Sequence, residues 1–148
     1  MIGFAIINSI EQLNADVIEN ARYIEGLFDK GEWGGCNQCY LLKDGRIGVI
    51  GHRSYKQLDS DGSELQIYVN ISFVFDYISF SVSDIRIIGD KSSYPDTEYM
   101  LDYLKDCAFT SGIVMRKDGK ADLYSGLGDV AEGRITIDAP FGELLQFN

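Results

Sequence analysis

A turn signal that occurs twice limits what this chain can fold into. Residues 43–46 read Lys-Asp-Gly-Arg, residues 117–120 read Lys-Asp-Gly-Lys, and apolar runs flank both segments. Asp-Gly between two apolar runs is a strong hairpin signal, because glycine readily adopts the positive φ of a tight turn. Each second strand then runs into glycine, at Gly51 and at Gly126. The repeated hairpin favours a repeat architecture built from antiparallel strands.

Other segments are also typical of strands. Residues 66–75 are aromatic and β-branched, and residues 84–88 alternate between apolar and polar side chains. Extended structure is expected as well at 107–109, 112–115 and 134–137. We therefore expect about nine or ten short strands with turn signals roughly every 8–12 residues, which is typical of a sandwich, barrel or propeller. Because propeller blades have about 40–50 residues, this length corresponds to about three blades.

The fold expected for residues 1–148 is thus mainly β: a single partial β-propeller domain with one or two short N-terminal helices. The helices are expected between Ser9 and Ile24, where apolar residues follow a helical rhythm and Ser9 and Gln12 have the spacing of a capping box. About three blades cannot close a ring of four to eight. Open blade edges would expose unpaired backbone groups, so we expect a homo-oligomer, coverage by residues 9–24, or both.

Charge and hydropathy exclude several partners. The 148 residues carry a net charge of −10, which would repel a phosphate backbone, so no nucleic acid is expected. No apolar stretch reaches the length of a membrane span, so no membrane partner is expected. The N-terminus lacks the basic start and long apolar middle of a signal peptide, and a cytoplasmic location is therefore expected.

Three cysteines and one histidine leave little scope for a metal centre. Cys36 and Cys39 have the spacing of a metal or redox pair, but a zinc site needs further ligands and His52 is the only histidine. The interpretation favoured here is that Cys36 and Cys39 are small buried residues on alternate sides of a strand. An odd cysteine count, completed by Cys107, argues against a disulfide framework. Neither a metal nor a cofactor is expected.

Three phrases of the sequence resemble one known family. They are Glu-Trp-Gly-Gly-Cys-Asn at 32–37, a strand ending Gly-His at 45–52, and Leu-Tyr-Ser-Gly-Leu-Gly-Asp at 123–129. Together they resemble an uncharacterised family of five-bladed β-propellers related to mannoside phosphorylases and to arabinanase- and invertase-type glycosidases. The resemblance covers nearly the whole chain, but only about the last half of the family's length. The chain departs from the family's pattern in residues 89–105, so no binding role is carried over to that segment.

The resemblance implies a pocket at the ends of the inner strands, and cleavage of a glycosidic bond there requires two carboxyl groups. Glu32, which precedes the Trp-Gly-Gly phrase, is the first catalytic candidate. Asp106, at the start of an apolar run that the resemblance places on an inner strand, is the second. The alternatives are a simple loop charge for Glu32 and a strand-entry or capping carboxylate for Asp106.

Three further residues are candidates for binding substrate. Trp33 could stack on the apolar side of a sugar ring, Asn37 could orient hydroxyl groups, and His52 could bind a hydroxyl or a phosphate. The alternatives are structural: a core anchor for Trp33, satisfaction of buried backbone for Asn37, and a structural histidine for His52.

The function expected from this reasoning is glycoside hydrolysis or phosphorolysis, with an oligosaccharide as the partner. Fold analogy alone does not assign a reaction. A non-catalytic carbohydrate-binding or interaction module therefore remains an alternative, and so does a truncated propeller without retained activity.

Overall fold

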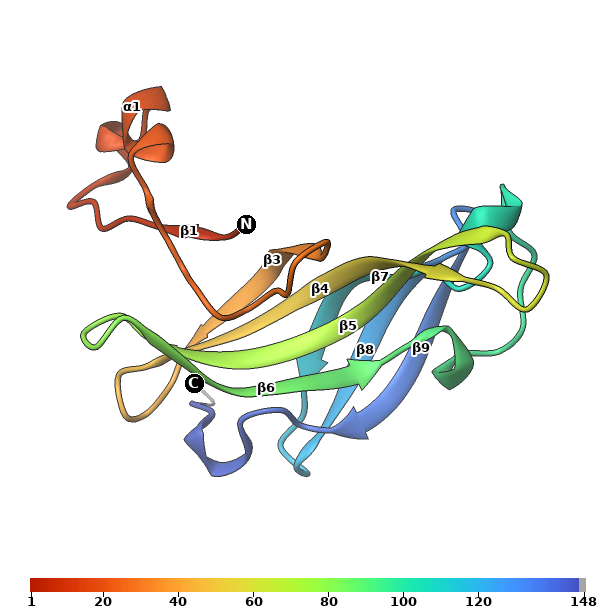
Figure 1. Cartoon of the computed structure of the whole chain (residues 1–148). Helices are drawn as coiled ribbons and strands as arrows, with labels where there is room; N and C mark the ends of the chain where they lie inside the picture. Colours follow the sequence, from red (N-terminus) through yellow and green to blue (C-terminus); the bar gives the residue numbers. More distant parts are fainter. Residues whose placement is uncertain (147–148) are drawn as a thin grey trace.

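Three antiparallel sheets account for about half of the residues in the computed structural model, which describes residues 1–146 (Figure 1). The largest sheet has four strands: β3 (Trp33–Leu41), β4 (Ile47–Leu58), β5 (Glu64–Asp76) and β6 (Ser81–Gly89). A second sheet contains β7 (Ala108–Met115), β8 (Lys120–Leu127) and β9 (Ala131–Asp138). A two-stranded sheet pairs β1 (Gly3–Phe4) with β2 (Arg22–Tyr23). The predicted mainly β, partial propeller fold is confirmed.

Both predicted hairpins form with the same turn geometry. Gly45 has a φ of +86° and Gly119 a φ of +81°, the left-handed conformation that glycine adopts without strain. In each turn the aspartate carboxylate accepts the backbone N–H two residues further on, at 3.1 Å in both cases. The repeated Lys-Asp-Gly signal therefore connects β3 to β4 and β7 to β8.

The first strand of each hairpin contains a β-bulge. In β3 the pairing with β4 shifts between Cys36 and Gln38, which leaves Asn37 as the extra residue. In β7 the pairing with β8 shifts between Thr110 and Gly112, which leaves Ser111 as the extra residue. An extra residue reverses the alternation of side chains beyond it. The two extended segments expected at 107–109 and 112–115 are consequently one strand interrupted by a bulge.

The four-stranded sheet is apolar on one face and mixed on the other. On β5, alternate residues supply the first face, a buried row that packs against Ile24, Leu27 and Phe4 from the N-terminal segment. The row comprises Leu65, Ile67, Val69, Ile71, Phe73 and Phe75. The opposite face of β5 carries buried Asn70 and meets the three-stranded sheet, which Figure 1 shows lying against it. Strand alternation thus divides β5 between an apolar core and a polar contact.

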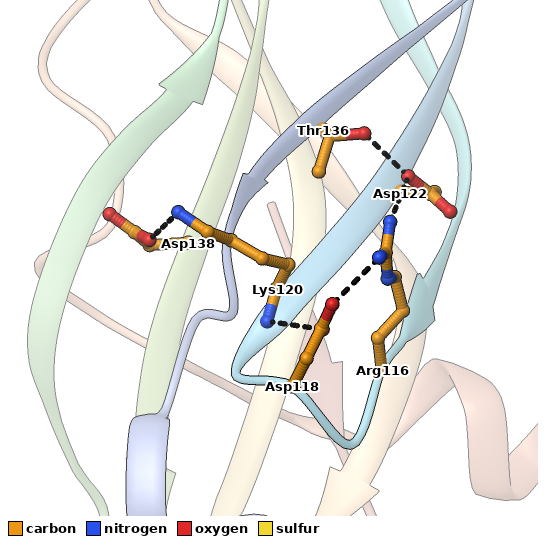
Figure 2. A network of polar contacts seen from close by, with 6 residues as sticks. All are labelled: Arg116, Asp118, Lys120, Asp122, Thr136 and Asp138. Atoms are coloured by element: carbon orange, nitrogen blue, oxygen red, sulfur yellow. Dashed lines mark hydrogen bonds and ion pairs between the residues drawn. The ribbon is translucent and has the colours of Figure 1, made fainter.

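The outer face of the three-stranded sheet is polar and solvated. Side chains on β9 alternate between partly buried and exposed along its whole length. Figure 2 shows the polar network on this face, in which Lys120 Nζ donates to Asp138 at 2.7 Å and Thr136 Oγ1 donates to Asp122 at 2.7 Å. Arg116 bonds to the turn residue Asp118 at 2.6 Å. The outer faces of the two larger sheets therefore differ: that of the four-stranded sheet is apolar and covered by the N-terminal segment, and that of the three-stranded sheet is polar and solvated.

The N-terminal segment contains a 3-10 turn (Ile10–Gln12) and one short helix, α1 (Ala15–Glu19), as predicted. The predicted capping box is wrong: Ser9 makes no side-chain cap, and Gln12 instead accepts the N–H of Asn8 at 2.8 Å. Asn14 caps α1 by accepting the N–H of Val17. Figure 1 shows α1 standing away from the two larger sheets, so the expected coverage of a sheet edge by this helix is not found.

Three more 3-10 turns occur, at Lys91–Ser93, Asp102–Leu104 and Gly142–Leu144. Three residues separate the second of these from the start of β7. Within residues 1–146, none of the helices has the length and apolar character needed to cross a bilayer.

Candidate functional site

The glycines of the two motifs make room for an imidazole ring. Gly35 pairs with His52 across β3 and β4, and a Cβ atom on Gly35 would lie 2.8 Å from Cε1 of His52. A Cβ on Gly34 would collide with the carbonyl oxygen of His52, and one on Gly51 with the carbonyl oxygen of Gly35. Only glycine at these positions lets the two backbones and the ring approach so closely. The Trp-Gly-Gly and Gly-His phrases therefore form one structural unit, in which Gly34, Gly35 and Gly51 make the space that His52 occupies.

Asn37 fixes the orientation and tautomer of that ring. Its Nδ2 donates to the carbonyl oxygen of Thr110 at 2.9 Å, so its Oδ1 faces Nδ1 of His52 at 2.8 Å as an acceptor. Nδ1 must then carry the proton, and Nε2 keeps a lone pair. Burial lowers the pKa of His52, whose exposed fraction is 7%, and this keeps the ring neutral near pH 7. His52 thus presents a hydrogen-bond acceptor.

Three aromatic rings surround His52. The ring centroid of His52 lies 4.3 Å from that of Phe109 and 5.8 Å from that of Trp33. Tyr68 completes the group, 5.5 Å from Trp33 and 5.8 Å from Phe109. Trp33 is 44% exposed and Phe109 37% exposed, so these rings remain accessible to a ligand. We call Trp33, His52, Tyr68 and Phe109 the ring cluster.

An ion pair lies on the opposite face of β4 from the ring cluster, because Arg53 pairs with Val69 of the apolar face whereas His52 pairs with Asn70. The guanidinium of Arg53 bonds to Glu32, whose second carboxylate oxygen accepts the N–H of Asp29 at 2.8 Å. The hydrogen bond from Arg53 holds the pKa of Glu32 below its usual value, so this carboxyl group is ionised at neutral pH. Nε of Arg53 is buried and has no hydrogen-bond partner among residues 1–146. An unpaired guanidinium N–H is a donor suited to an anionic or hydroxyl ligand.

The second predicted carboxylate lies elsewhere. Asp106 lies two residues before β7 begins and lines a cavity of about 210 Å³ together with Tyr55, Gln57 and Asp90. Its backbone oxygen faces the N–H of Tyr68 at 3.4 Å, which places the main chain near the ring cluster. The structure thus brings together Trp33, Asn37 and His52. Glu32 instead bonds to Arg53, which projects from the other face of β4. The catalytic roles of Glu32 and Asp106 stay predictions.

Sequence reasoning missed the residues that join the two sheets behind the site. Asn70 Nδ2 lies 2.8 Å from Oγ1 of Thr110 and 3.0 Å from Oγ of Ser125, and its Oδ1 accepts from Tyr94 at 2.9 Å. Thr110 in turn donates to the carbonyl oxygen of Gly51 at 2.7 Å. The available signal was an asparagine in the middle of an apolar strand, where a polar group must find partners.

The predicted arrangement of the cysteine pair is wrong. Cys36 and Cys39 are both exposed, and their Sγ atoms lie 3.2 Å apart. In a regular strand these positions point to opposite faces, but the bulge at Asn37 turns them to the same face. Cys107 is buried. In the described part of the chain, no cluster of three or more His, Cys, Asp and Glu side chains is arranged to hold a metal.

The fold and these strand contacts define a partial β-propeller with a ring cluster where β3, β4, β5 and β7 meet. The chain belongs to the family described as a protein of unknown function, DUF1861, whose family model matches residues 1–143. No curated protein sequence matches it.

Several solved structures are similar. A mannose phosphorylase from Leishmania mexicana, MPT-4, solved with a phosphate ion, is 53% identical with a TM-score of 0.89, over 94% of this chain and 43% of that one. MPT-1, a GDP-Man-dependent mannosyltransferase from Leishmania mexicana, is 44% identical with a TM-score of 0.87, over 94% and 45%. A hypothetical protein from Leishmania major is 52% identical with a TM-score of 0.83, over 94% and 44%. The chain thus spans less than half the length of each.

Proposed function

We propose that this chain forms part of a carbohydrate-active site that binds mannose and transfers it to or from phosphate. The observation that carries the proposal is the ring cluster, in which half-exposed aromatic rings surround a neutral histidine with a free acceptor nitrogen. Apolar ring faces combined with a few oriented polar groups are typical of small-molecule sites. Similarity to a mannose phosphorylase supports the choice of sugar and of reaction class.

Each group has a definite task in this proposal. Trp33 stacks on the apolar side of the sugar ring, and Nε2 of His52 accepts a sugar hydroxyl proton. Asn37 positions His52. Glu32, which is ionised through its bond with Arg53, orients that guanidinium on the opposite face of β4.

Phosphorolysis requires that the bond from the sugar's C1 to the leaving oxygen breaks while C1 bonds to a phosphate oxygen. The leaving oxygen must gain a proton. Since Glu32 is held ionised, it is a poor proton donor. Asp106 is the other predicted carboxyl group, and this task would require the sugar to extend from the ring cluster to the separate cavity that Asp106 lines. Phosphorolysis is favoured over transfer from a nucleotide sugar because identity to the phosphorylase is higher, 53% against 44%.

The test begins with binding, because the chain spans less than half of its similar structures. Purified protein is titrated calorimetrically with mannose and with a mannobiose, with and without inorganic phosphate. We expect Trp33→Ala to weaken sugar binding about tenfold or more, as does His52→Ala, since both remove direct contacts. Tyr23→Ala, which changes an exposed tyrosine remote from the ring cluster, is the matched control. Binding that is unaffected by Trp33→Ala and His52→Ala would refute the proposed site.

Turnover then separates the reactions. Release of mannose 1-phosphate only with phosphate supports phosphorolysis, release of free mannose without phosphate supports hydrolysis, and consumption of GDP-mannose supports transfer. Sugar binding with no turnover supports the second candidate, a carbohydrate-binding module. Asp106→Asn should abolish turnover while sugar affinity is retained, and full activity in that variant would exclude Asp106 as the proton donor.

We also propose that the chain self-associates, and that a five-bladed ring is the complete form of the fold. Exposed apolar side chains in the N-terminal segment support this: Ile6, Ile10, Leu13 and Ile18 are each at least half exposed. Sedimentation equilibrium over a range of concentrations measures the mass. A strictly monomeric protein at high concentration would contradict self-association.

A further inference from the structure

The cysteine pair on β3 has a geometry that the proposed sugar site does not use. The two Sγ atoms lie 3.2 Å apart on one face of the strand, held there by the bulge at Asn37. A disulfide requires about 2.05 Å between sulfurs, so a movement of about 1 Å would join them. Because both residues belong to one short bulged segment, the sheet pairing on either side of them need not move far.

The surroundings of the pair admit a small reagent. Cys36 and Cys39 line a cavity of about 170 Å³ together with Phe4, Val49 and Phe73. Both cysteine residues are exposed, while Cys107 is buried beside β7. The chain therefore contains two accessible thiols in contact with each other and a third that is shielded from solvent.

The contact between the thiols also makes one of them reactive. A hydrogen bond from the Cys36 thiol lowers the pKa of Cys39 to about 7, so a large fraction of Cys39 is thiolate at neutral pH. The same contact, together with burial, raises the pKa of Cys36. Burial raises the pKa of Cys107 to about 11, so Cys107 stays protonated. The thiolate is the nucleophile in thiol–disulfide exchange, and only the pair supplies one.

We propose that Cys36 and Cys39 form a dithiol modification site that a low-molecular-weight disulfide, such as glutathione disulfide, oxidises to an intrachain disulfide. The Cys39 thiolate attacks one sulfur of the reagent, whose S–S bond breaks and releases one small thiol after protonation. The Cys36 thiol then loses its proton to solvent and its sulfur attacks Cys39, expelling the second small thiol. Two protein thiols are oxidised by two electrons, and one disulfide is reduced to two thiols.

Oxidation would act on the residue that positions His52. The disulfide closes a four-residue ring around Asn37, whose side chain bridges His52 and the carbonyl oxygen of Thr110. The bulge would then be held in one conformation by a covalent bond. If the proposed function is correct, sugar affinity should differ between the oxidised and reduced forms, but the oxidation itself does not depend on that function.

The test counts thiols in the full chain. Reduced protein is equilibrated at pH 7.5 in buffers that range from reduced glutathione to glutathione disulfide. It is then denatured in the presence of N-ethylmaleimide, which alkylates every free thiol, and its mass is measured by mass spectrometry. We expect alkylation to fall from three sites to one in a single step, with Cys107 as the modified residue. Non-reducing electrophoresis should show a monomeric chain, which excludes a bond between molecules.

Variants make the result decisive. Cys107→Ser should still form the disulfide, and neither of its two remaining cysteines should then be alkylated. Cys36→Ser and Cys39→Ser should instead stop at a mixed disulfide with glutathione, and Cys36→Ser should react faster because it retains Cys39. Three alkylated cysteines under fully oxidising conditions would overturn the proposal, as would a disulfide that contains Cys107.

Discussion

The two hairpin units of this molecule share a scaffold but differ in chemistry. The two turns are equivalent when the numbering is shifted by 74 residues, so that Lys43 corresponds to Lys117. The first strand of each hairpin has a β-bulge six residues before this lysine. The bulge residue is Asn37 in one unit and Ser111 in the other. The shift also places His52 on Gly126.

The first unit supplies the polar side chains of the candidate site, and the second unit mainly holds them in position. The first unit provides the imidazole, its positioning amide and the Arg53–Glu32 pair. The second unit provides mainly backbone and packing: the carbonyl oxygen of Thr110 holds Asn37, and Phe109 covers His52. A repeated backbone thus serves as a platform in both copies and as a binding site in only one.

The largest effect should come from breaking the polar contact between β5 and the second unit. Asn70→Ala removes one hydrogen bond from each of the buried groups at Thr110, Ser125 and Tyr94, and we expect a loss of about 3 kcal/mol in the free energy of unfolding. Urea denaturation measures it. Asn8→Ala, at an exposed asparagine, should change stability by less than about 0.5 kcal/mol. Equal midpoints for the two variants would show that the amide network does not hold the sheets together.

A smaller loss should follow from filling the space beneath His52. The Cβ of Gly35→Ala would displace the imidazole, and we expect about 2 kcal/mol of destabilisation together with weaker sugar binding. Gly126→Ala is the matched control, because nothing lies within 4 Å of the added atom and Gly126 holds the position equivalent to His52. If both substitutions reduced stability equally, close packing between Gly35 and His52 would not limit which residue can occupy position 35.

The third effect is a pH dependence that only the first unit possesses. Because burial depresses the pKa of His52 below 6.5, the unfolded chain takes up a proton more readily than the folded one. The stabilisation is therefore fully present above pH 6.5 and is lost as the pH falls through the folded-state value. Unfolding midpoints from pH 7.5 to 5.5 should fall more steeply for the wild type than for His52→Gln. Since His52 is the only histidine, parallel curves would contradict its neutral, buried state.

The smallest effect should be one that the units share. Asp44 and Asp118 occupy equivalent turn positions, and hydrogen bonds within each turn lower the pKa of both carboxyl groups. Asp44→Asn and Asp118→Asn should each produce only a slight, similar decrease in the thermal midpoint, because exposed ion pairs contribute little. A markedly larger loss for Asp118→Asn would mean that the network in Figure 2 stabilises the second unit beyond its turn.

The sequence predicted the features that depend on local chemistry. The two Asp-Gly turns predicted both hairpins, and the Trp-Gly-Gly and Gly-His phrases supplied the binding candidates Trp33, Asn37 and His52, which lie together in the structure. The bulges were not predictable, because one extra residue has no compositional signature, and this is why the cysteine pair was placed on opposite faces. Tyr68 and Phe109 were missed for a different reason: they reach the site from separate sheets, and such long-range proximity leaves no pattern in either strand.

The bulge at Asn37 divides β3 into two stretches that follow opposite alternation. Before Asn37, the odd-numbered residues of β3 lie on the same face of the sheet as His52. After Asn37, the even-numbered residues lie on that face. Along β3, substitutions should be tolerated at every second residue, and this alternation should shift by one residue at Asn37. A deep mutational scan would show whether the shift occurs. Inserting or deleting one residue here would turn every side chain in one half of β3 to the opposite face of the sheet. The single extra residue Asn37 therefore determines which side chains of that half are buried and which are exposed.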